Sequence, residues 1–315
     1  MIRVENLSKN YGTVKAVRSI SFDLDDGQVV GFLGANGAGK STTLKIMTGY
    51  ISPSAGNVYY NDHNIQENTS EIQKDIGYLP ELNPLYGEMR VHDYLKFISE
   101  IRGISKENFK SAFQKVVEEC ALNAVAHRTI GNCSKGYKQR IGLAAAMIHD
   151  PKILILDEPV TGLDPNQIVE IRQLIKKLGK EKIVIMSSHI LQEIQATVDR
   201  IIIINEGSIV ADGSSDSLLS DTNAQTELSM DVENADENDI NDMKATIPSI
   251  DIASISKEDT YTKINIKYPK NNDPRSDIFK YAVDKGWTIL EMFATKQNLE
   301  DIFRNLTSSN ESNNG

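Results

Sequence analysis

The sequence predicts an α/β fold with a mostly parallel core sheet, followed by a smaller α+β domain. The first observation is the segment 34–42, GANGAGKST, which matches the phosphate-binding loop pattern G-x-x-x-x-G-K-[ST] at every fixed position. An apolar run at residues 29–33 precedes it and a helical segment follows, as that loop requires. The second is the apolar run at residues 153–156, typical of a strand buried on both faces of a parallel sheet. The third is the length of 315 residues, which favours two domains.

Composition and charge exclude several classes of protein. The chain is 40% apolar and 25% charged, as in soluble globular proteins, and its apolar runs are far shorter than the roughly 20 residues that span a bilayer. The N-terminus lacks the apolar core of a signal peptide, so we expect a cytoplasmic chain. Two cysteines, Cys120 and Cys133, indicate neither a disulfide framework nor a metal cluster. The net charge of −10, with nine acidic and no basic residues at positions 214–243, argues against nucleic acid as a partner.

The segment 34–42 carries groups suited to the phosphates of a nucleotide. Three glycines let the backbone approach an anion and turn its N–H groups toward it: Gly34, Gly37 and Gly39. The helix that starts here adds its positive dipole end. Lys40 supplies a charge for the β- and γ-phosphates, Ser41 a hydroxyl for Mg²⁺, and Thr42 lies next to the α- and β-phosphates. The alternative, a glycine-rich turn before an ordinary helix, is disfavoured by the flanking strand and helix.

Two carboxylates and a histidine end predicted buried strands. Asp157 and Glu158 directly follow the run 153–156, where carboxylates are costly to bury unless they serve a cation or a polar site. With a phosphate loop upstream, we expect Asp157 to orient Mg²⁺ and its waters, and Glu158 to polarise the attacking water. A solvated acidic turn is the alternative. His189 ends a parallel strand, where a histidine is usually structural but could here reach a γ-phosphate.

Three further residues carry local signals that leave alternatives open. Ser134 is a candidate N-cap of the helix expected at residues 141–149, which follows a helical lobe at residues 91–126. Asp164 precedes a proline and is a candidate helix cap, and local pattern does not decide whether it does more. Tyr11 could stack on an adenine ring, although the residues alone favour a strand-edge tyrosine.

Residues 1 to about 213 resemble the nucleotide-binding subunit of ABC transporters, with all landmarks in the family's order. Segment 34–42 resembles Walker A, and segment 153–158 resembles Walker B with its adjacent glutamate. The remaining members of the phosphate-binding set by this resemblance are Ala35, Asn36 and Ala38. Asp164 falls in the D-loop and His189 is the switch histidine.

The resemblance also changes the interpretation of three positions. Tyr11 falls where the family's adenine-stacking aromatic sits, which reverses the local preference. Residues 133–137 occupy the signature motif, normally LSGGQ, and depart from it at three positions while keeping Ser134 and Gly136. Those two supply a hydroxyl and a close backbone at a helix N-terminus, which in the family face the nucleotide of the partner subunit. Glu81 stands where glutamine is usual, and a carboxylate there can accept from Mg²⁺-bound water.

Fold, cofactors and partners follow from the resemblance as expectations. It implies a P-loop NTPase core with an N-terminal antiparallel β-subdomain and a helical subdomain at about residues 85–150. It implies ATP and Mg²⁺ as cofactors, with Ser41, Asp157 and Glu81 as the metal-site residues. It also implies a homodimer, or a pair with a second ATPase subunit, on an integral membrane permease at the inner face of the cell membrane.

Residues 214–306 are expected to form the second domain. Their pattern predicts the order β-α-β-β-α-β of a small ferredoxin-like domain, with Trp287 in its core. Asp273 is expected to cap the second helix, with Pro274 at its first position. Residues 298–306 are read as a short helix and residues 307–315 as a disordered tail. The ending NLEDIFRNLT, with Glu81 and the string SKGYKQR, resembles exporter-type ATPases, particularly those associated with gliding motility.

These motifs together predict an ATP-hydrolysing subunit that drives a separate membrane protein. The rival is a soluble ABC-type ATPase that acts on ribosomes or DNA, which usually carries two nucleotide-binding units or a long coiled-coil insertion. One phosphate loop and no heptad run argue against that rival. A nucleotide-responsive scaffold that scarcely hydrolyses ATP is a third reading, kept open by the altered signature motif.

Overall fold

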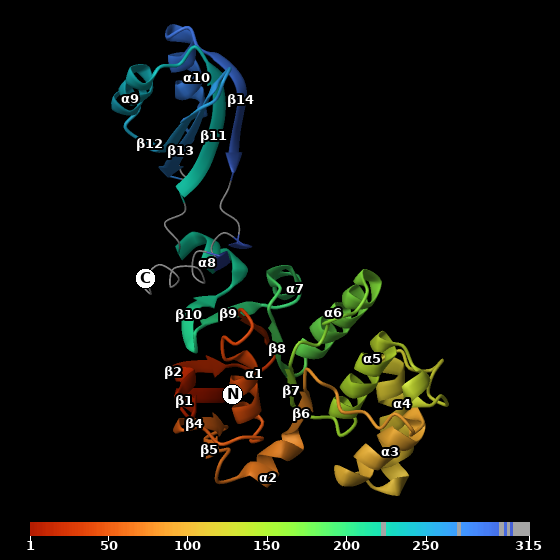
Figure 1. The fold of residues 1–315 in the computed structure, drawn as a ribbon. Coiled ribbons are helices and arrows are strands. Elements are labelled where there is room, and N and C mark those ends of the chain that lie inside the picture. Colours follow the sequence, from red (N-terminus) through yellow and green to blue (C-terminus); the bar gives the residue numbers. More distant parts are fainter. Residues whose placement is uncertain (222–224, 270–271, 296–298, 301–302, 305–315) are drawn as a thin grey trace. The chain divides into compact units, whose positions relative to one another are not determined.

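The structure is a computed structural model that describes residues 1–221, 225–269, 272–295, 299–300 and 303–304. Its contacts divide the chain into two compact units, with the boundary between Ser215 and Asp216. The first unit holds two sheets and the helices around them, and the second unit holds a third sheet (Figure 1). Within the described part of the chain, no helix is both long enough and apolar enough to cross a membrane.

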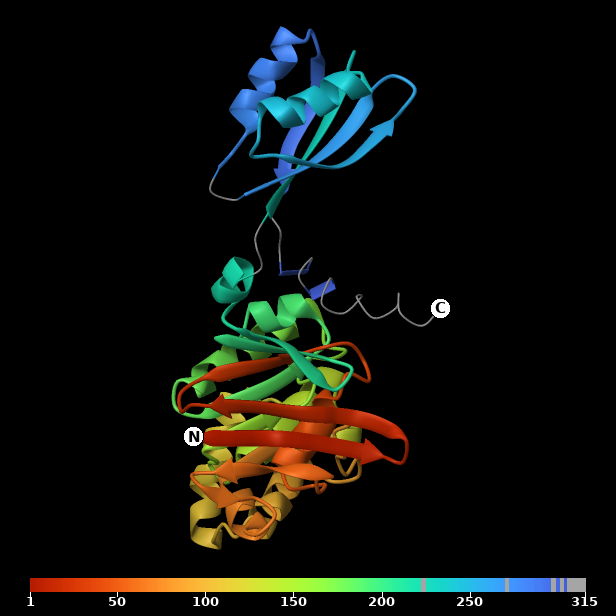
Figure 2. The same cartoon turned by 90° about the vertical axis from the view of Figure 1, so that its left-hand side faces the viewer.

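An antiparallel sheet of four strands opens the first unit. Its strands are β1 (Ile2–Tyr11), β2 (Val14–Leu24), β4 (Ala55–Tyr60) and β5 (His63–Asn64). Their order is β2-β1-β4-β5, and Figure 2 shows β1 and β2 side by side as long red strands. Because β1 pairs with β2 on one side and with β4 on the other, Ile2 lies opposite both Leu24 and Tyr60. This is the predicted N-terminal antiparallel β-subdomain.

A six-stranded sheet forms the core of the first unit. Its strands are β3 (Val29–Leu33), β6 (Ile76–Leu79), β7 (Ile153–Leu156), β8 (Ile183–Ser188), β9 (Arg200–Asn205) and β10 (Ser208–Gly213). The order is β10-β9-β3-β8-β7-β6, and every neighbouring pair is parallel except β9 with β10. An apolar cluster joins the two sheets, with Phe22 and Phe32 edge to face at 5.2 Å between ring centroids. The four strands β3, β8, β7 and β6 therefore end at one edge of the sheet.

Seven α-helices flank these sheets in the first unit as described. They are α1 (Lys40–Met47), α2 (Thr69–Ile72), α3 (Val91–Ile101), α4 (Lys106–Glu119), α5 (Lys135–Met147), α6 (Pro165–Gly179) and α7 (Leu191–Gln195). Helix α1 contributes to the cluster between the sheets, α5 packs on β6, and both α6 and α7 pack on β3 and β8. The sequence places the start of α5 too late, at residue 141, because the cap at Ser134 starts the helix at Lys135.

The second unit is a four-stranded antiparallel sheet with two helices. After α8 (Ser215–Asp221), its elements are β11 (Gln225–Glu233), α9 (Glu237–Thr246), β12 (Asp251–Lys257), β13 (Thr262–Pro269), α10 (Arg275–Asp284) and β14 (Thr288–Thr295). The strand order β12-β13-β11-β14 and the connectivity β-α-β-β-α-β are those of a ferredoxin-like fold. Trp287, with 6% of its surface exposed, lies in the core of this unit as predicted and contacts Tyr281 edge to face.

One helix start in the second unit differs from the prediction. The N-cap of α10 is Pro274 rather than Asp273, and the helix begins at Arg275. Asp273 still serves the helix start, because its carboxylate accepts from the Arg275 N–H at 3.1 Å. Most of the helix predicted at residues 298–306, and the whole tail 307–315, lie outside the described residues.

Candidate nucleotide-binding site

A cleft of about 420 Å³ opens where the parallel strands end. Its lining includes most of the residues singled out in the sequence, from the loop after β3 and from the segments after β6, β7 and β8. The lining residues are Ala16, Asn36, Gly37, Gly39, Lys40, Ser41, Thr42, Glu81, Glu158, Thr161 and His189. The volume falls in the range that holds a small molecule or cofactor.

The loop between β3 and α1 requires its glycines. A Cβ on Gly34 would lie 2.4 Å from the Ile204 carbonyl oxygen, and a Cβ on Gly39 would lie 2.5 Å from that of Ala16. Gly37 has a φ of +82° and faces open space, so its backbone is accessible from the cleft. These close backbone approaches leave no room for a side chain at Gly34 or Gly39.

The N-terminus of α1 has no side chain that caps it. Its N-cap is Gly39, whereas α4, α5 and α6 have side-chain caps from Ser105, Ser134 and Asp164. The first N–H groups of a helix have no partner within the helix. At α1 these groups, together with the helix dipole, are therefore directed to the cleft, where an anion can satisfy them.

Lys40 is a buried cation at the centre of this loop. Its ammonium donates to the carbonyls of Gly34 and Ala35, at 2.8 and 3.1 Å, and lies 3.7 Å from Glu158 Oε1. Its side chain is only 6% exposed, and burial lowers its pKa although Glu158, Asp157 and Glu81 favour the charged form. Backbone carbonyls are weak partners for a buried charge, so phosphate oxygens would be stronger ones.

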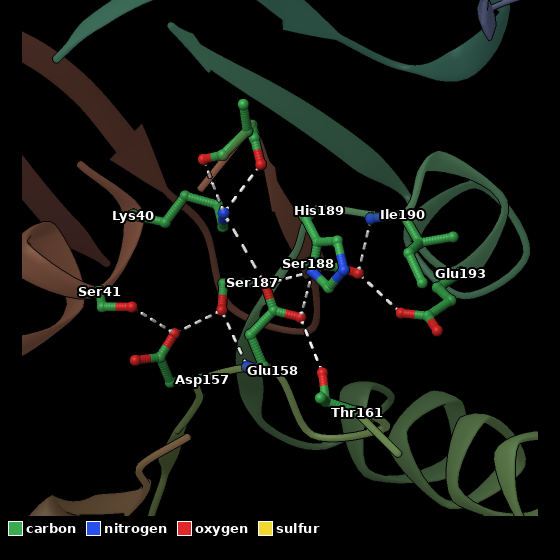
Figure 3. A network of polar contacts seen from close by, with 12 residues as sticks. Lys40, Ser41, Asp157, Glu158, Thr161, Ser187, Ser188, His189, Ile190 and Glu193 are labelled. Atoms are coloured by element: carbon green, nitrogen blue, oxygen red, sulfur yellow. Dashed lines mark hydrogen bonds and ion pairs between the residues drawn. The ribbon is translucent and has the colours of Figure 1, made fainter. Parts of the chain in front are cut away.

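Asp157 is buried and does not line the cleft itself, but it is hydrogen-bonded to Ser41, which does. Asp157 is 1% exposed, and its Oδ1 accepts from Ser41 Oγ at 3.0 Å and from Ser187 Oγ at 2.6 Å (Figure 3). A hydroxyl and a carboxylate are hard oxygen donors, which suit Mg²⁺. Among the residues described, no three His, Cys, Asp or Glu side chains group as a metal site.

Glu158 is held in a fixed position by its backbone and its carboxylate. Its φ of +51° is uncommon for a residue with a side chain, and its N–H donates to Ser187 Oγ at 2.9 Å. The carboxylate accepts from Thr161 Oγ1 at 3.0 Å and lies 3.0 Å from His189 Nδ1 (Figure 3). Figure 3 shows Glu158 between Lys40 and His189, so the predicted catalytic trio lies together in one cleft.

Comparison with known proteins identifies the family of this chain. The family described as ABC transporter matches residues 17–161. The bacitracin transport ATP-binding protein BcrA of Bacillus licheniformis is 32% identical over 305 residues, which cover 96% of each chain. The chain belongs to the ABC transporter family of ATP-binding proteins. Members of this family are ATPases coupled to transport.

Two further relatives agree with this family. The linearmycin resistance ATP-binding protein LnrL of Bacillus subtilis is 31% identical over 308 residues, which cover 98% of each chain. A solved structure of an ATP-binding subunit of an ABC transporter has a TM-score of 0.64 at 27% identity, over 70% of this chain and 92% of that one. The fold predicted for the core, a P-loop ATPase with mostly parallel strands, is confirmed.

Three expected residues of the ABC family motifs lie away from the cleft lining. Ser134 caps α5 by accepting from the Tyr137 N–H at 3.3 Å, and Asp164 caps α6 by accepting from the Gln167 N–H at 3.0 Å. Gly136 is buried against Gln167, where a Cβ would lie 2.2 Å from the Gln167 side-chain oxygen. The signature-like turn and the D-loop therefore contact each other rather than the cleft of the same chain.

Other expected positions differ in how close they are to the cleft. Glu81 is exposed and lines it. Tyr11, 50% exposed at the end of β1, does not line it, and its ring lies 5.3 Å from the Lys9 ammonium. The carbonyls of Gly34 and Ala35 accept from Lys40, and Ala38 is a buried residue of the same loop.

Four residues of this polar network are absent from the sequence-based site. They are Thr161, Ser187, Ser188 and Glu193. The two serines carried a usable signal, because a buried apolar strand that ends in hydroxyls is the same pattern as one that ends in carboxylates. Thr161 and Glu193 carried none, since a polar residue in a loop or a short helix is ordinary.

Proposed function

We propose that this chain binds and hydrolyses ATP to energise a separate membrane permease. The observation that carries the proposal is the meeting of Lys40, Ser41, Asp157, Glu158 and His189 around the uncapped start of α1. A cation and an uncapped helix end suit phosphate, and a fixed carboxylate beside a histidine suits the activation of water.

Each side chain has a distinct role in the proposed reaction. Glu158 polarises the water that attacks the γ-phosphate, and His189, at 3.0 Å from that carboxylate, contacts the same phosphate. Lys40 moves from the Gly34 and Ala35 carbonyls to the β- and γ-phosphates, where it stabilises the developing charge. When Mg²⁺ is bound, it neutralises phosphate charge, and Ser41, Asp157 and, through water, Glu81 would hold it.

The residues away from the cleft act in this proposal on a second subunit. Ser134 and Gly136 at the start of α5, with Asp164 in the adjacent turn, contact the nucleotide of the partner. Tyr11 stacks on the adenine ring. Family members form dimers and pair with membrane permeases, which supports this arrangement. The partner is a second copy of this chain or another ATPase subunit.

Export is the proposed direction of transport. Two relatives that align with nearly the whole chain carry names of bacitracin transport and linearmycin resistance, which supports an exporter. The chain then works at the cytoplasmic face of the membrane, with the permease as its partner and without nucleic acid. A role in gliding motility stays a prediction from the C-terminal resemblance.

The test of the partner is a pull-down from detergent-solubilised membranes of the source cell. The bait is tagged Glu158→Gln chain with Mg-ATP, and the control is the tag alone. We expect a stoichiometric polytopic membrane protein, whose identity narrows the cargo. Recovery of ribosomes, of DNA-repair proteins or of nothing would favour the soluble ATPase instead.

Nucleotide binding is tested separately with Lys40→Ala. Removal of the ammonium should weaken ATP binding by about tenfold or more, because a hydrogen bond to a charged group is worth roughly 1.5–3 kcal/mol. Lys45→Ala is the matched control, since this lysine lies on the same helix outside the cleft lining. Equal ATP affinity of the two variants in equilibrium binding would contradict the role of Lys40.

A further inference from the structure

Strand β8 ends in two buried serines whose hydroxyls serve different neighbours. Ser187 donates to Asp157 and accepts from the Glu158 N–H, on the side of the cleft. Ser188, also fully buried, donates to Glu193 Oε2 on α7 at 2.7 Å (Figure 3). Successive side chains of a strand point to opposite faces, which explains the separation. The Ser187 contacts belong to the proposed ATPase site, whereas the Ser188 contact does not touch it.

Glu193 is a buried carboxylate that accepts a hydrogen bond from a neutral hydroxyl. It is 5% exposed, and among the residues that the structure describes no Lys, Arg or His forms an ion pair with it. A buried carboxylate is costly unless hydrogen bonds compensate it. Here the Ser188 hydroxyl donates a hydrogen bond to the carboxylate, so the pair is a small buried polar unit at the contact between α7 and β8.

The Ser188 hydroxyl connects this unit to the backbone that carries His189. While it donates to Glu193, it accepts from the Ile190 N–H at 3.0 Å. Ser188 and Ile190, the residues on both sides of His189, are thereby linked to the Glu193 carboxylate through one hydroxyl. The His189 side chain is 39% exposed, and among the described residues it hydrogen-bonds with the Glu158 carboxylate. The position of its ring thus depends on the backbone at residues 188–190.

We propose that Glu193 and Ser188 are positioning residues for His189. Glu193 orients the Ser188 hydroxyl, the hydroxyl fixes the Ile190 N–H, and the turn then presents the imidazole to Glu158 and to the cleft. This inference rests on the proposed role of His189 in ATP hydrolysis. A purely structural role, in which the pair only stabilises the start of α7, is the competing explanation.

The test compares turnover, nucleotide affinity and dependence on His189. Glu193→Ala and Ser188→Ala should each lower kcat by about tenfold or more, because small displacements of a catalytic group are costly. Affinity for ADP should stay within about twofold, since neither residue lines the cleft. Glu193→Gln and Ser188→Thr, which keep the acceptor and the hydroxyl, should recover most of the turnover.

Two controls separate positioning from stability. Thr197→Val removes a buried hydroxyl of the same region, one that donates to the Glu193 carbonyl, and should leave kcat unchanged. In a His189→Ala chain, Glu193→Ala should lower kcat no further, because its effect passes through the ring. Thermal unfolding of every variant verifies that it is folded at the assay temperature.

The outcomes distinguish the positioning role of Glu193 and Ser188 from the ATPase function on which it rests. If His189→Ala is slow while Glu193→Ala and Ser188→Ala are normal, the inference is wrong and the ATPase proposal stands. An equal loss from Glu193→Ala with and without His189 would show a structural role and also overturn the inference. Normal turnover of His189→Ala would overturn both the role of His189 and the inference.

Discussion

The two units of this chain bury different kinds of side chain. In the described part of the first unit, five residues with charged side chains are buried: Lys40, Arg140, Asp157, Glu158 and Glu193. In the described part of the second unit, the buried polar residues are two threonines, Thr226 and Thr262. Buried charge is costly, so a fold retains it where it contributes to function or is paired. This difference indicates that ATP binding and hydrolysis take place in the first unit, whereas the core of the second unit is apolar.

The largest effect that tests this comparison is expected from Glu158→Gln. Turnover should fall by about 10²-fold or more, because the amide cannot polarise water as the carboxylate does. ATP binding and ATP-dependent dimerisation should persist, measured by equilibrium binding and size-exclusion chromatography. Glu181→Gln, an exposed acid of the same unit, is the control for phosphate release. Normal steady-state turnover of Glu158→Gln would contradict the role of Glu158 in polarising the attacking water.

A matched pair of core substitutions compares the two units directly. Leu44 on α1 and Leu228 on β11 are both 0% exposed, so each Leu→Ala change should lower the unfolding free energy by about 2–5 kcal/mol. Leu44→Ala should also slow ATP turnover, because α1 carries the phosphate loop. Leu228→Ala should leave turnover unchanged at temperatures where both variants stay folded. A comparable loss of turnover in Leu44→Ala and Leu228→Ala would contradict the assignment of ATP hydrolysis to the first unit alone.

Acid should destabilise the first unit through His149. Its imidazole, with Nε2 3.1 Å from the Ile76 carbonyl, has its pKa lowered to about 4 by burial and then by the charge of Arg102. The unfolded chain therefore takes up the proton first, and the unfolding free energy should fall as pH drops from about 6.5 to about 4. The expected loss is about 3 kcal/mol from a shift of this size.

His149→Gln should remove this pH dependence, because glutamine stays neutral and can still donate to Ile76. Urea unfolding at pH 7 and at pH 4.5, followed by circular dichroism, measures the change. Trp287 is the single tryptophan, so its fluorescence follows the second unit in the same samples. The fluorescence transition should be the same for the unmodified chain and for the His149→Gln variant. An unchanged dichroism transition would contradict the assignment to His149.

Most of the site could be predicted because its signals are local. The spacing of Gly34, Gly39, Lys40 and Ser41 defines a phosphate loop, and the carboxylates after β7 follow from the cost of burial. The parallel arrangement then brings segments that are far apart in sequence to one edge of the sheet. The predicted connectivity of the second unit, β-α-β-β-α-β, also agrees with the observed order of its elements.

What could not be predicted depends on non-local contacts and on the folding of turns. Pairing of β1 with both β2 and β4 joins residues as far apart as Ile2 and Tyr60, which no local pattern specifies. The contacts of Thr161 with Glu158 and of Glu193 with Ser188 are close in sequence, and they could not be predicted because they depend on how the turns after β7 and β8 fold. Tyr11 is the opposite case. Its place in the family motif could be recognised from the sequence, but the residue does not line the cleft.

The smallest predicted effect uses one local motif that occurs in both units. Asp164 caps α6 by accepting from the Gln167 N–H at 3.0 Å, and Asp236 caps α9 by accepting from the Asp239 N–H at 2.8 Å. Replacement of either aspartate by alanine should lower the unfolding free energy by about 1 kcal/mol. Asn variants should keep both caps, because the amide oxygen also accepts from a backbone N–H.

The two caps should differ in function although they are alike in stability. Asp164→Ala should slow ATP turnover, because the proposed dimer places this turn at the nucleotide of the partner subunit. Asp236→Ala should leave turnover unchanged, because its unit buries no Lys, Arg, His, Asp or Glu among the residues described. Phosphate release and urea unfolding of the two variants measure both quantities. Equal ATP turnover of the two variants would show that Asp164 serves only as a helix cap. The functional difference between the two units would then rest on the buried residues of the cleft alone.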